Sequence, residues 1–375
     1  MTITATDRLP GGTTLDRVQN ELRRALDRPC LVLDRVDCTT VDHRITAPAT
    51  GSLTHVRIEA HDGAPLTLRL VVKVLQAARY GLPVQMPPEE RERIAASIPW
   101  RLEEEVYTGD TARRMPAGMR LPRLYAAVEH PEDRLSLWLE DVDPLDGSWT
   151  SADLARAATG LGRLTVRRAD QDLPSRPDTT FIAHLVANAL HRWAIPLVRG
   201  DDLWRHPAFD QPAVTALRGD LLDLADRVDD LLASLAAVPR VNTHGDPTPM
   251  NLLRPRSAPD EFVLIDWGTS ALGPAGWDVV PLVFGPAENG TAAPDDLPDR
   301  LGVAVPAFAA GLAAEGMDLP EAALATAVRT CALLRYPMTS LPLSEVVRGE
   351  PVTPDLLAYA RRKAAFVRAV LDACG

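Results

Sequence analysis

The chain has 375 residues, of which 46% are hydrophobic, and its formal net charge is −11. This length and apolar content suffice for a core shared by two or three subdomains. The acidic balance argues against a nucleic-acid-binding protein, because binding to phosphates needs a basic face. It suits a neutral or cationic small substrate, although many soluble enzymes are acidic for solubility alone.

The start of the chain and its cysteines indicate a cytoplasmic protein. The polar opening MTITATDRLPGG does not resemble a signal peptide. No apolar run approaches the roughly 18 residues of a membrane-spanning helix. The four cysteines, Cys30, Cys38, Cys331 and Cys374, form no CxxC pair and have no histidine at ligand spacing. We therefore expect reduced thiols and no membrane partner.

A helix and three strands are predicted at the start of the chain. Residues 14–28 have apolar positions at helical spacing, and 41–75 contain three β-rich runs. A Gly/Ser/Thr turn at ATGSLT (49–54) would join the first two strands. HDGAP (61–65) would join the second to the third, since Asp-Gly favours a hairpin.

The third predicted strand contains a rare lysine. The chain has 40 Lys and Arg residues, and only Lys73 and Lys363 are lysines. An ammonium is a compact charge on a flexible stem, whereas a guanidinium is a wide planar fork. A lysine kept in the apolar run LRLVVKVL (68–75) therefore indicates a tight site, such as one that contacts phosphate oxygens. The alternative is a strand lysine whose charged end reaches solvent.

Two further strands complete the predicted sheet. After the Pro-rich loop GLPVQMPPEE, a helix is expected near 89–109, followed by strand-like runs at 121–130 and 134–143. The pattern predicts a five-stranded antiparallel sheet with a helix inserted after the third strand.

From about residue 150 onward the chain is mostly helical. TSADLARAATGLGRLTVRR (150–168) opens with a Thr/Ser N-cap, and 180–199, 212–238 and much of 297–374 also have helical patterns. We predict an N-terminal lobe over 1–138, a connecting hinge over 139–147 and a larger helical lobe over 148–375.

The stretch THGDPTPMN (243–251) raises the question of chemistry. Phosphoryl transfer from a nucleotide needs Mg²⁺, a carboxylate that orients the attacking hydroxyl, and a cation on the phosphates. One carboxylate and one amide oxygen suffice for Mg²⁺, which usually keeps several waters. Asp246 and Asn251 would supply base and ligand. Asp266 would complete the metal site at the end of a hairpin formed by 251–255 and 261–266.

Each of these residues alone is equally consistent with an ordinary turn. The combination is specific: H-G-D-x-x-x-x-N, then I-D-W, behind a β-rich lobe with one strand lysine. It resembles the aminoglycoside phosphotransferase/choline kinase family, which has a protein-kinase-like fold. The resemblance covers roughly residues 40–285 and is carried by HGDPTPMN and VLIDWG. It implies an α+β, two-lobe architecture whose catalytic loop region spans 243–268.

The resemblance also implies roles for individual residues. Asp246 would be the catalytic base, and Asn251 and Asp266 would bind Mg²⁺. Lys73 would contact the α- and β-phosphates, and His244 would steady the loop.

A helix glutamate would hold Lys73. Glu103, Glu104 and Glu105 are consecutive and point about 100° apart on a helix. The family pattern favours Glu103, which stands four residues before Tyr107, and leaves Glu104 as the alternative.

Other parts of the nucleotide site have weaker signatures. Gly51 and Ser52 would cradle phosphate through small side chains and backbone N–H groups, although a plain hairpin turn explains them equally. The backbones of Glu140 and Val142 would read the base edge. Asp278, after a Gly/Pro turn, would cap a helix or brace the catalytic loop.

The acceptor is not readable from the sequence. The insertion at about 173–238 would shape its site, where Trp193, Trp204, Asp201 and Asp202 could bind an amino sugar or a sugar-nucleoside. The alternative places these tryptophans in the core and the acids at helix starts. One departure is LGRLTVRR (161–168), where many relatives carry a histidine.

The expected activity is a small-molecule O-phosphotransferase that uses ATP or GTP, Mg²⁺ and a hydroxyl acceptor. Antibiotic modification is one option, and phosphorylation of choline, homoserine or a sugar is another. A non-catalytic nucleotide-binding protein of the same fold stays open. A protein kinase is disfavoured, because no APE-type segment or long activation loop follows Asp266. Oligomeric state is not readable.

Overall fold

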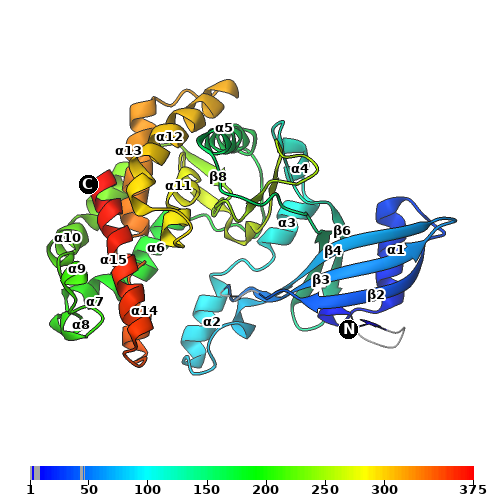
Figure 1. Ribbon diagram of the computed structural model, residues 1–375, viewed down its shortest axis with the longest axis horizontal. Coiled ribbons are helices and arrows are strands. Elements are labelled where there is room, and N and C mark those ends of the chain that lie inside the picture. Colours follow the sequence, from blue (N-terminus) through cyan, green and yellow to red (C-terminus); the bar gives the residue numbers. More distant parts are fainter. Residues whose placement is uncertain (1, 4–8, 43–44, 46) are drawn as a thin grey trace.

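The computed structural model describes residues 2–3, 9–42, 45 and 47–375. Figure 1 shows a twisted sheet at one end and a large group of helices at the other. The sheet order is β1-β2-β3-β4-β7-β6, and every neighbouring pair is antiparallel. Its strands are β1 (Thr2–Ile3), β2 (Val32–Thr40), β3 (Thr50–His61), β4 (Pro65–Gln76), β6 (Leu124–His130) and β7 (Arg134–Glu140).

The predicted five-stranded antiparallel sheet is confirmed, with the two-residue β1 added at one edge. The position predicted for its first strand, between residue 41 and the turn at 49–54, is wrong, because that strand is β2 and ends at Thr40. The predicted turn at 49–54 is also wrong: Gly51 and Ser52 lie in β3, where the register with β4 shifts between Thr50 and Ser52. The connection between β2 and β3 therefore lies earlier, and residues 43, 44 and 46 fall outside the described residues.

One face of the sheet is covered by α1 (Leu15–Leu26), which begins at a Thr14 cap (Figure 1). Val18 and Leu22 of α1 pack with Val36, Ile58 and Trp138 of the sheet. The predicted helix near 89–109 is two helices, α2 (Pro88–Ala96) and α3 (Leu102–Thr108), because Ser97–Arg101, which include Pro99, interrupt it.

The helical lobe is built around α5 (Ser151–Arg167) and α12 (Leu297–Ala314). A Cβ on Gly162 would stand 2.3 Å from Phe308 O, and a Cβ on Gly311 would stand 2.2 Å from Thr159 O. Only glycines allow the two backbones to approach so closely. The other helices are α4 (Thr111–Arg114), α6 (Phe181–Leu185), α7 (Ile195–Arg199), α8 (Asp201–Arg205), α9 (Pro212–Thr215), α10 (Arg218–Ser234), α11 (Val279–Glu288), α13 (Glu321–Arg335), α14 (Leu343–Val347) and α15 (Pro354–Cys374).

A π-helix, Val186–Ala194, joins α6 to α7 into one helical segment. By length and composition this segment, Phe181–Arg199, would be able to cross a membrane, a test that core helices also pass. Sequence inspection did not single it out, because polar residues such as His184 and Arg192 interrupt its apolar positions. Here it contacts α10 and α13 inside the helical lobe.

Two small sheets carry the predicted catalytic segments. Strands β8 (Arg240–Thr243) and β11 (Ala271–Pro274) pair antiparallel. In the other sheet β10 (Phe262–Leu264) lies between β5 (Met119–Arg120) and β9 (Leu252–Leu253). The antiparallel β9–β10 pair is the hairpin predicted from 251–255 and 261–266.

Candidate active site

The loop after β8 is held by a buried, neutral histidine. His244 is 0% exposed, and burial together with nearby Arg168 lowers its pKa to about 3. Its Nε2 donates to Ile265 O (3.1 Å), and its Nδ1 accepts from the Asp246 N–H (3.4 Å). The ring therefore ties the Asp246 loop to the segment that ends in Asp266, and it does not face a substrate as a base.

Asp278 braces the same loop from behind. Its carboxylate accepts from the backbone N–H groups of His244 (2.9 Å) and Gly245 (3.0 Å). It makes no side-chain cap to α11, so of the two predicted roles the structure shows the brace. Gly245 has φ +99, and a Cβ there would stand 2.0 Å from Thr269 O, so this position requires glycine.

Asp246 and Asn251 contact each other. The Asn251 Nδ2 donates to Asp246 O (2.8 Å) and Oδ2 (3.2 Å). In this arrangement the amide oxygen of Asn251 accepts no hydrogen bond from the described residues, and it is available to a cation. Burial first, and then the charge of Asp266, raises the pKa of Asp246 to about 6, while Arg335 opposes the shift.

Lys73 lies between two carboxylates that come from different parts of the chain. Its Nζ is 2.6 Å from Glu103 Oε2 and 2.6 Å from Asp266 Oδ1. Burial opposes the charged form, but the two acids outweigh it and raise the pKa of the ammonium. Burial also raises the pKa of Glu103, and Lys73 counters this shift.

The three consecutive glutamates of α3 point to different partners. Glu103 faces Lys73, Glu104 pairs with Arg101 (2.7 Å), and Glu105 accepts from the Ser175 N–H (3.0 Å). The structure therefore pairs Lys73 with Glu103 and not with Glu104.

A cleft of about 540 Å³ lies between the sheet and the catalytic loop. Lys73, Glu103, Asn251 and Asp266 line one part of it. The rest is mostly apolar and suits a planar base; it includes Leu53, Val71, Leu139, Val142, Leu253 and Ile265.

Of the residues predicted less securely for the nucleotide site, one pair lines this cleft and the other pair does not. Gly51 and Ser52 are absent from the lining of this cleft. Glu140 and Val142 line it, but the Glu140 N–H already donates to Arg123 O (2.8 Å), so this N–H is not free for a base.

A second cavity of about 410 Å³ lies on the other side of Asp246. Phe181, Trp277, Pro281 and Tyr336 form apolar walls, and Glu288 and Arg335 add charges. Sequence reasoning missed Glu288 and Arg335, because they stand at the ends of α11 and α13 without a motif around them.

The residues predicted to grip an amino sugar do not line this cavity. Trp204 is buried and donates to Val198 O (2.7 Å), and Trp193 packs partly buried against the main core. Asp201 pairs with Arg218 and Asp202 with Arg205. Their positions agree with the alternative reading, core tryptophans and acids at a helix start.

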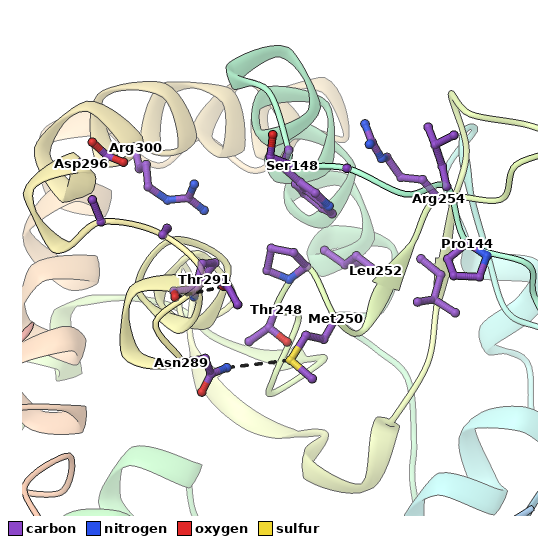
Figure 2. Close-up of a pocket in the computed structure, with 18 residues that line it drawn as sticks. Pro144, Ser148, Thr248, Met250, Leu252, Arg254, Asn289, Thr291, Asp296 and Arg300 are labelled. Atoms are coloured by element: carbon purple, nitrogen blue, oxygen red, sulfur yellow. Dashed lines mark hydrogen bonds between the residues drawn. The ribbon is translucent and has the colours of Figure 1, made fainter. Parts of the chain in front are cut away.

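A third cavity, of about 570 Å³, lies beside residues 144–149, at the end of the predicted hinge (Figure 2). Thr248 and Met250 project toward it from the catalytic loop, and Asn289 Nδ2 lies 3.9 Å from Met250 Sδ. Met250 is 57% exposed and lines all three cavities. The cavities therefore converge on the loop that carries Asp246.

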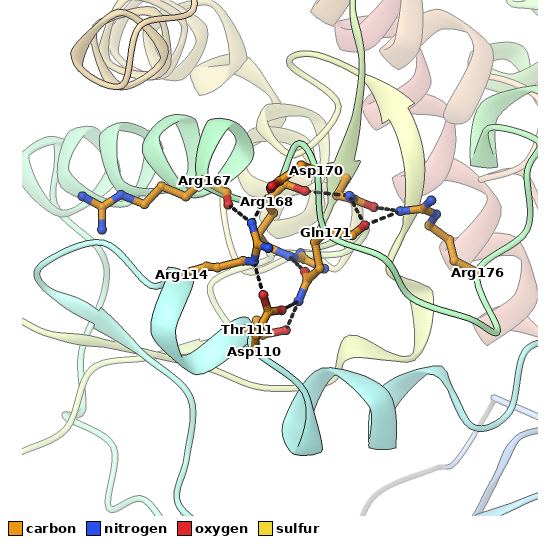
Figure 3. A network of polar contacts seen from close by, with 9 residues as sticks. Asp110, Thr111, Arg114, Arg167, Arg168, Asp170, Gln171 and Arg176 are labelled. Atoms are coloured by element: carbon orange, nitrogen blue, oxygen red, sulfur yellow. Dashed lines mark hydrogen bonds and ion pairs between the residues drawn. The ribbon is translucent and has the colours of Figure 1, made fainter.

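A buried polar network supports this loop from α5 (Figure 3). Arg168 is 0% exposed and donates to Gln171 Oε1 (2.6 Å), Thr243 O (3.3 Å) and Ser270 Oγ (3.2 Å). Burial lowers the pKa of its guanidinium to about 10. Arg168 closes the segment LGRLTVRR (161–168), and it joins β8 to the segment after Asp266.

The donor set around Asp266 fits Mg²⁺ better than a soft metal. No group of three or more His, Cys, Asp or Glu side chains among the described residues is arranged to hold a metal ion. Asn251 and Asp266 supply oxygen atoms, the ligands that Mg²⁺ prefers, and phosphate oxygens usually complete such a site.

Comparison with known proteins points to one group. The model of the family described as "Phosphotransferase enzyme family" matches residues 103–313, more than half of the chain. A search of curated proteins finds no significant match.

Three solved structures have a similar fold. An aminoglycoside phosphotransferase from Alicyclobacillus acidocaldarius is 16% identical, with a TM-score of 0.52 and coverage of 88% of this chain and 89% of that one. A choline kinase from Cryptosporidium parvum is 14% identical, with a TM-score of 0.50 and coverage of 89% and 88%. A mutant of aminoglycoside 2'-phosphotransferase-IIIa, in complex with GDP, is 12% identical, with a TM-score of 0.51 and coverage of 94% and 97%.

Proposed function

Because the chain belongs to the phosphotransferase enzyme family, we propose that it moves the γ-phosphate of a nucleoside triphosphate to a hydroxyl group of a small molecule. The observation that carries this proposal is the position of Lys73, held between Glu103 and Asp266 in the cleft beside the Asp246 loop. A strand lysine held by a helix glutamate, together with a metal-binding aspartate, is the arrangement that phosphoryl transfer requires in kinases.

The chain's own residues divide the work. Lys73 binds phosphate oxygens, and the apolar part of the cleft holds the base. Asn251 and Asp266 would hold Mg²⁺, which when bound neutralises charge on the phosphates. Asp246 accepts the proton of the acceptor hydroxyl, and the Asn251 amide orients its carboxylate for this task.

ATP is the donor we propose. GTP is the alternative, and one of the similar structures was solved with GDP. The acceptor enters from the cavity that Asp246 shares with Glu288 and Arg335. Antibiotics and metabolites are both candidate acceptors, since similar folds occur in an aminoglycoside phosphotransferase and a choline kinase.

The decisive test is Asp246→Asn. We expect turnover to fall by about 10²–10⁴-fold, because a positioned base contributes about that much. Nucleotide affinity should stay unchanged, since Asp246 does not line the nucleotide cleft. Mg²⁺-dependent nucleotide consumption is measured with aminoglycosides, macrolides, nucleoside antibiotics, choline, homoserine and simple sugars.

Asp318→Asn, on an exposed loop, is the matched control and should keep full turnover. Full turnover by Asp246→Asn would refute the assignment of the base. Nucleotide binding without transfer to any compound would favour the non-catalytic alternative.

A further inference from the structure

The cavity beside Asp246 contains one cation, Arg335, that lacks a carboxylate partner. Arg335 is the last residue of α13 and the only Lys or Arg among the described residues that line this cavity. Its side chain donates one long hydrogen bond, to Thr339 Oγ1 (3.5 Å), and its guanidinium lies 5.2 Å from the Tyr336 ring. In the described part of the chain, no Asp or Glu forms an ion pair with it.

The acids around this cavity are already engaged. Asp266 contacts Lys73, and Asp246 accepts from Asn251. Glu288 accepts from Ser340 Oγ (3.0 Å), and its Oε1 lies 3.9 Å from the Nζ of Lys363. Lys363, the second of the two lysines, also donates to Glu288 O (2.9 Å). Lys363 thus compensates Glu288, whereas Arg335 forms no ion pair among the described residues and interacts with Asp246 only at longer range.

Unlike the cavity itself, the space next to it lacks acidic groups among the described residues. A hollow of about 460 Å³ shares Phe181 and Thr269 with it. Its described lining contains no Asp, Glu, Lys or Arg. The part of a polycationic amino sugar that extended into this hollow would therefore meet no carboxylate there.

We propose that Arg335 binds a carboxylate of the acceptor, so that the substrate class is a hydroxylated carboxylic acid rather than a polycationic amino sugar. This inference rests on the proposed function. A guanidinium fork matches a carboxylate through two parallel hydrogen bonds. Arg335 does not line the nucleotide cleft, which separates this role from that of Lys73.

The test compares carboxylates with their uncharged amides. Glucuronate and glucuronamide, glycerate and glyceramide, and N-acetylhomoserine and its amide are titrated by calorimetry into enzyme that is saturated with Mg²⁺ and a non-hydrolysable ATP analogue. The wild type should bind at least one carboxylate tenfold or more tightly than its amide. Arg335→Ala should remove this preference, and Arg335→Glu should reverse it. Arg329→Glu, an exposed charge reversal on the same helix, should retain it.

Initial rates of phosphorylation separate this inference from the proposed function. Phosphorylation without an Arg335-dependent preference in any pair overturns the inference and leaves the function standing. A preference in binding without transfer to any acceptor supports the anion site and contradicts the function. An equal loss of turnover for carboxylates and amides in Arg335→Ala would assign Arg335 to the transferring phosphate and overturn the inference. Fastest turnover of an aminoglycoside would also overturn it.

Discussion

At the residue scale, the position of Lys73 explains why this arginine-rich chain keeps a lysine there. Its side chain is 9% exposed, and its single nitrogen meets both carboxylates at 2.6 Å. A guanidinium would present a wider plane to the same narrow space. A lysine therefore suits this position both by its charge and by its size. Of its two carboxylate partners, Glu103 is the more deeply buried.

We predict that Glu103→Gln weakens nucleotide binding, while Glu104→Gln does not. The first change removes a buried charged partner of Lys73 and should cost about 1.5–3 kcal/mol, or roughly tenfold to a hundredfold in affinity. Glu104 pairs with the partly exposed Arg101 and should contribute at most about 1 kcal/mol. Calorimetric titration with the ATP analogue measures both. Equal losses would show that the pairing with Lys73 does not support nucleotide binding.

Part of the candidate site could be predicted from sequence alone. The spacing of Asp246, Asn251 and Asp266 indicated a common site. Lys73 was identified because the chain contains only two lysines. The family pattern favoured Glu103, but only the orientation of α3 in the structure shows that Glu103, and not Glu104, faces Lys73. Arg335 was not predictable, because only tertiary packing brings the end of α13 to the Asp246 loop. The roles of all these residues remain predictions.

At the element scale, the start of α5 connects two parts of the site. Thr150 and Asp153 form a capping box, in which the Asp153 N–H donates to Thr150 Oγ1 and Asp153 Oδ2 accepts from the Thr150 N–H. Asp153 also pairs with Arg254 (2.5 Å), which follows β9. The cap therefore fastens α5 to the chain that leaves the catalytic loop.

We predict that Asp153→Asn destabilises the fold in a pH-dependent way. Burial opposes ionisation, but the bonds from Thr150 and Arg254 outweigh it and lower the pKa of Asp153 to about 2. A carboxyl whose folded pKa is below its unfolded value stabilises the fold above the unfolded pKa, and this contribution disappears as pH falls toward the folded pKa. The variant should lose about 2 kcal/mol at pH 7, as expected for a shift of this size from about 3.8.

Urea unfolding from pH 7 down to pH 2 measures this difference. The gap between wild type and variant should narrow between about pH 4 and pH 2. A gap that is constant with pH would mean that Asp153 acts through shape and not through charge.

Element boundaries were harder to predict than element types. In β2, charged residues such as Asp34, Arg35 and Asp37 mask the strand pattern, and a register shift between Leu33 and Arg35 interrupts the alternation of buried and exposed positions. In β3, the sequence around Gly51 resembles a turn, whereas the structure has a strand there with an irregular register.

At the scale of the whole molecule, the two lobes are interleaved in sequence. Strand β5 precedes β6 and β7 in the chain, yet it pairs in parallel with β10, the strand that leads to Asp266. From β5, Arg120 holds Glu140 through two bonds of 2.7 and 2.8 Å. The end of β7, at the start of the predicted hinge, is therefore fastened to the small sheet whose strand β10 leads to Asp266.

We predict that Arg120→Ala loosens this link. Loss of the partly exposed pair should cost about 1 kcal/mol, or roughly fivefold in nucleotide affinity. The matched control is Arg348→Ala, which removes exposed pairs with Glu345 and Glu350 at the end of α14, away from the predicted hinge. Nucleotide affinity by calorimetry should be unchanged in the control. An equal change in both variants would indicate a general effect of charge.

The fold as a whole was the most predictable feature. The family match and the three similar structures confirm the resemblance and the protein-kinase-like α+β fold predicted from the sequence. Alternating strand patterns and two spaced motifs were enough for that. The close packing of α5 on α12 was not foreseeable, because Gly162 and Gly311 lie far apart in sequence and each looks like an ordinary helical glycine.

The scarcity of lysine has a consequence for covalent modification. Acylating reagents modify many surface lysines in most proteins, but this chain has only two side-chain amines. Lys73 lines the cleft beside the sheet, and Lys363 donates to Glu288, which lines the cavity beside Asp246. The two differ in nucleophilicity: the pKa of Lys73 is raised, so its amine stays protonated, whereas burial lowers the pKa of Lys363. Acetylation or carbamoylation would thus begin at Lys363, which contacts Glu288, and would alter the cavity beside Asp246 before it reached the cleft that contains Lys73.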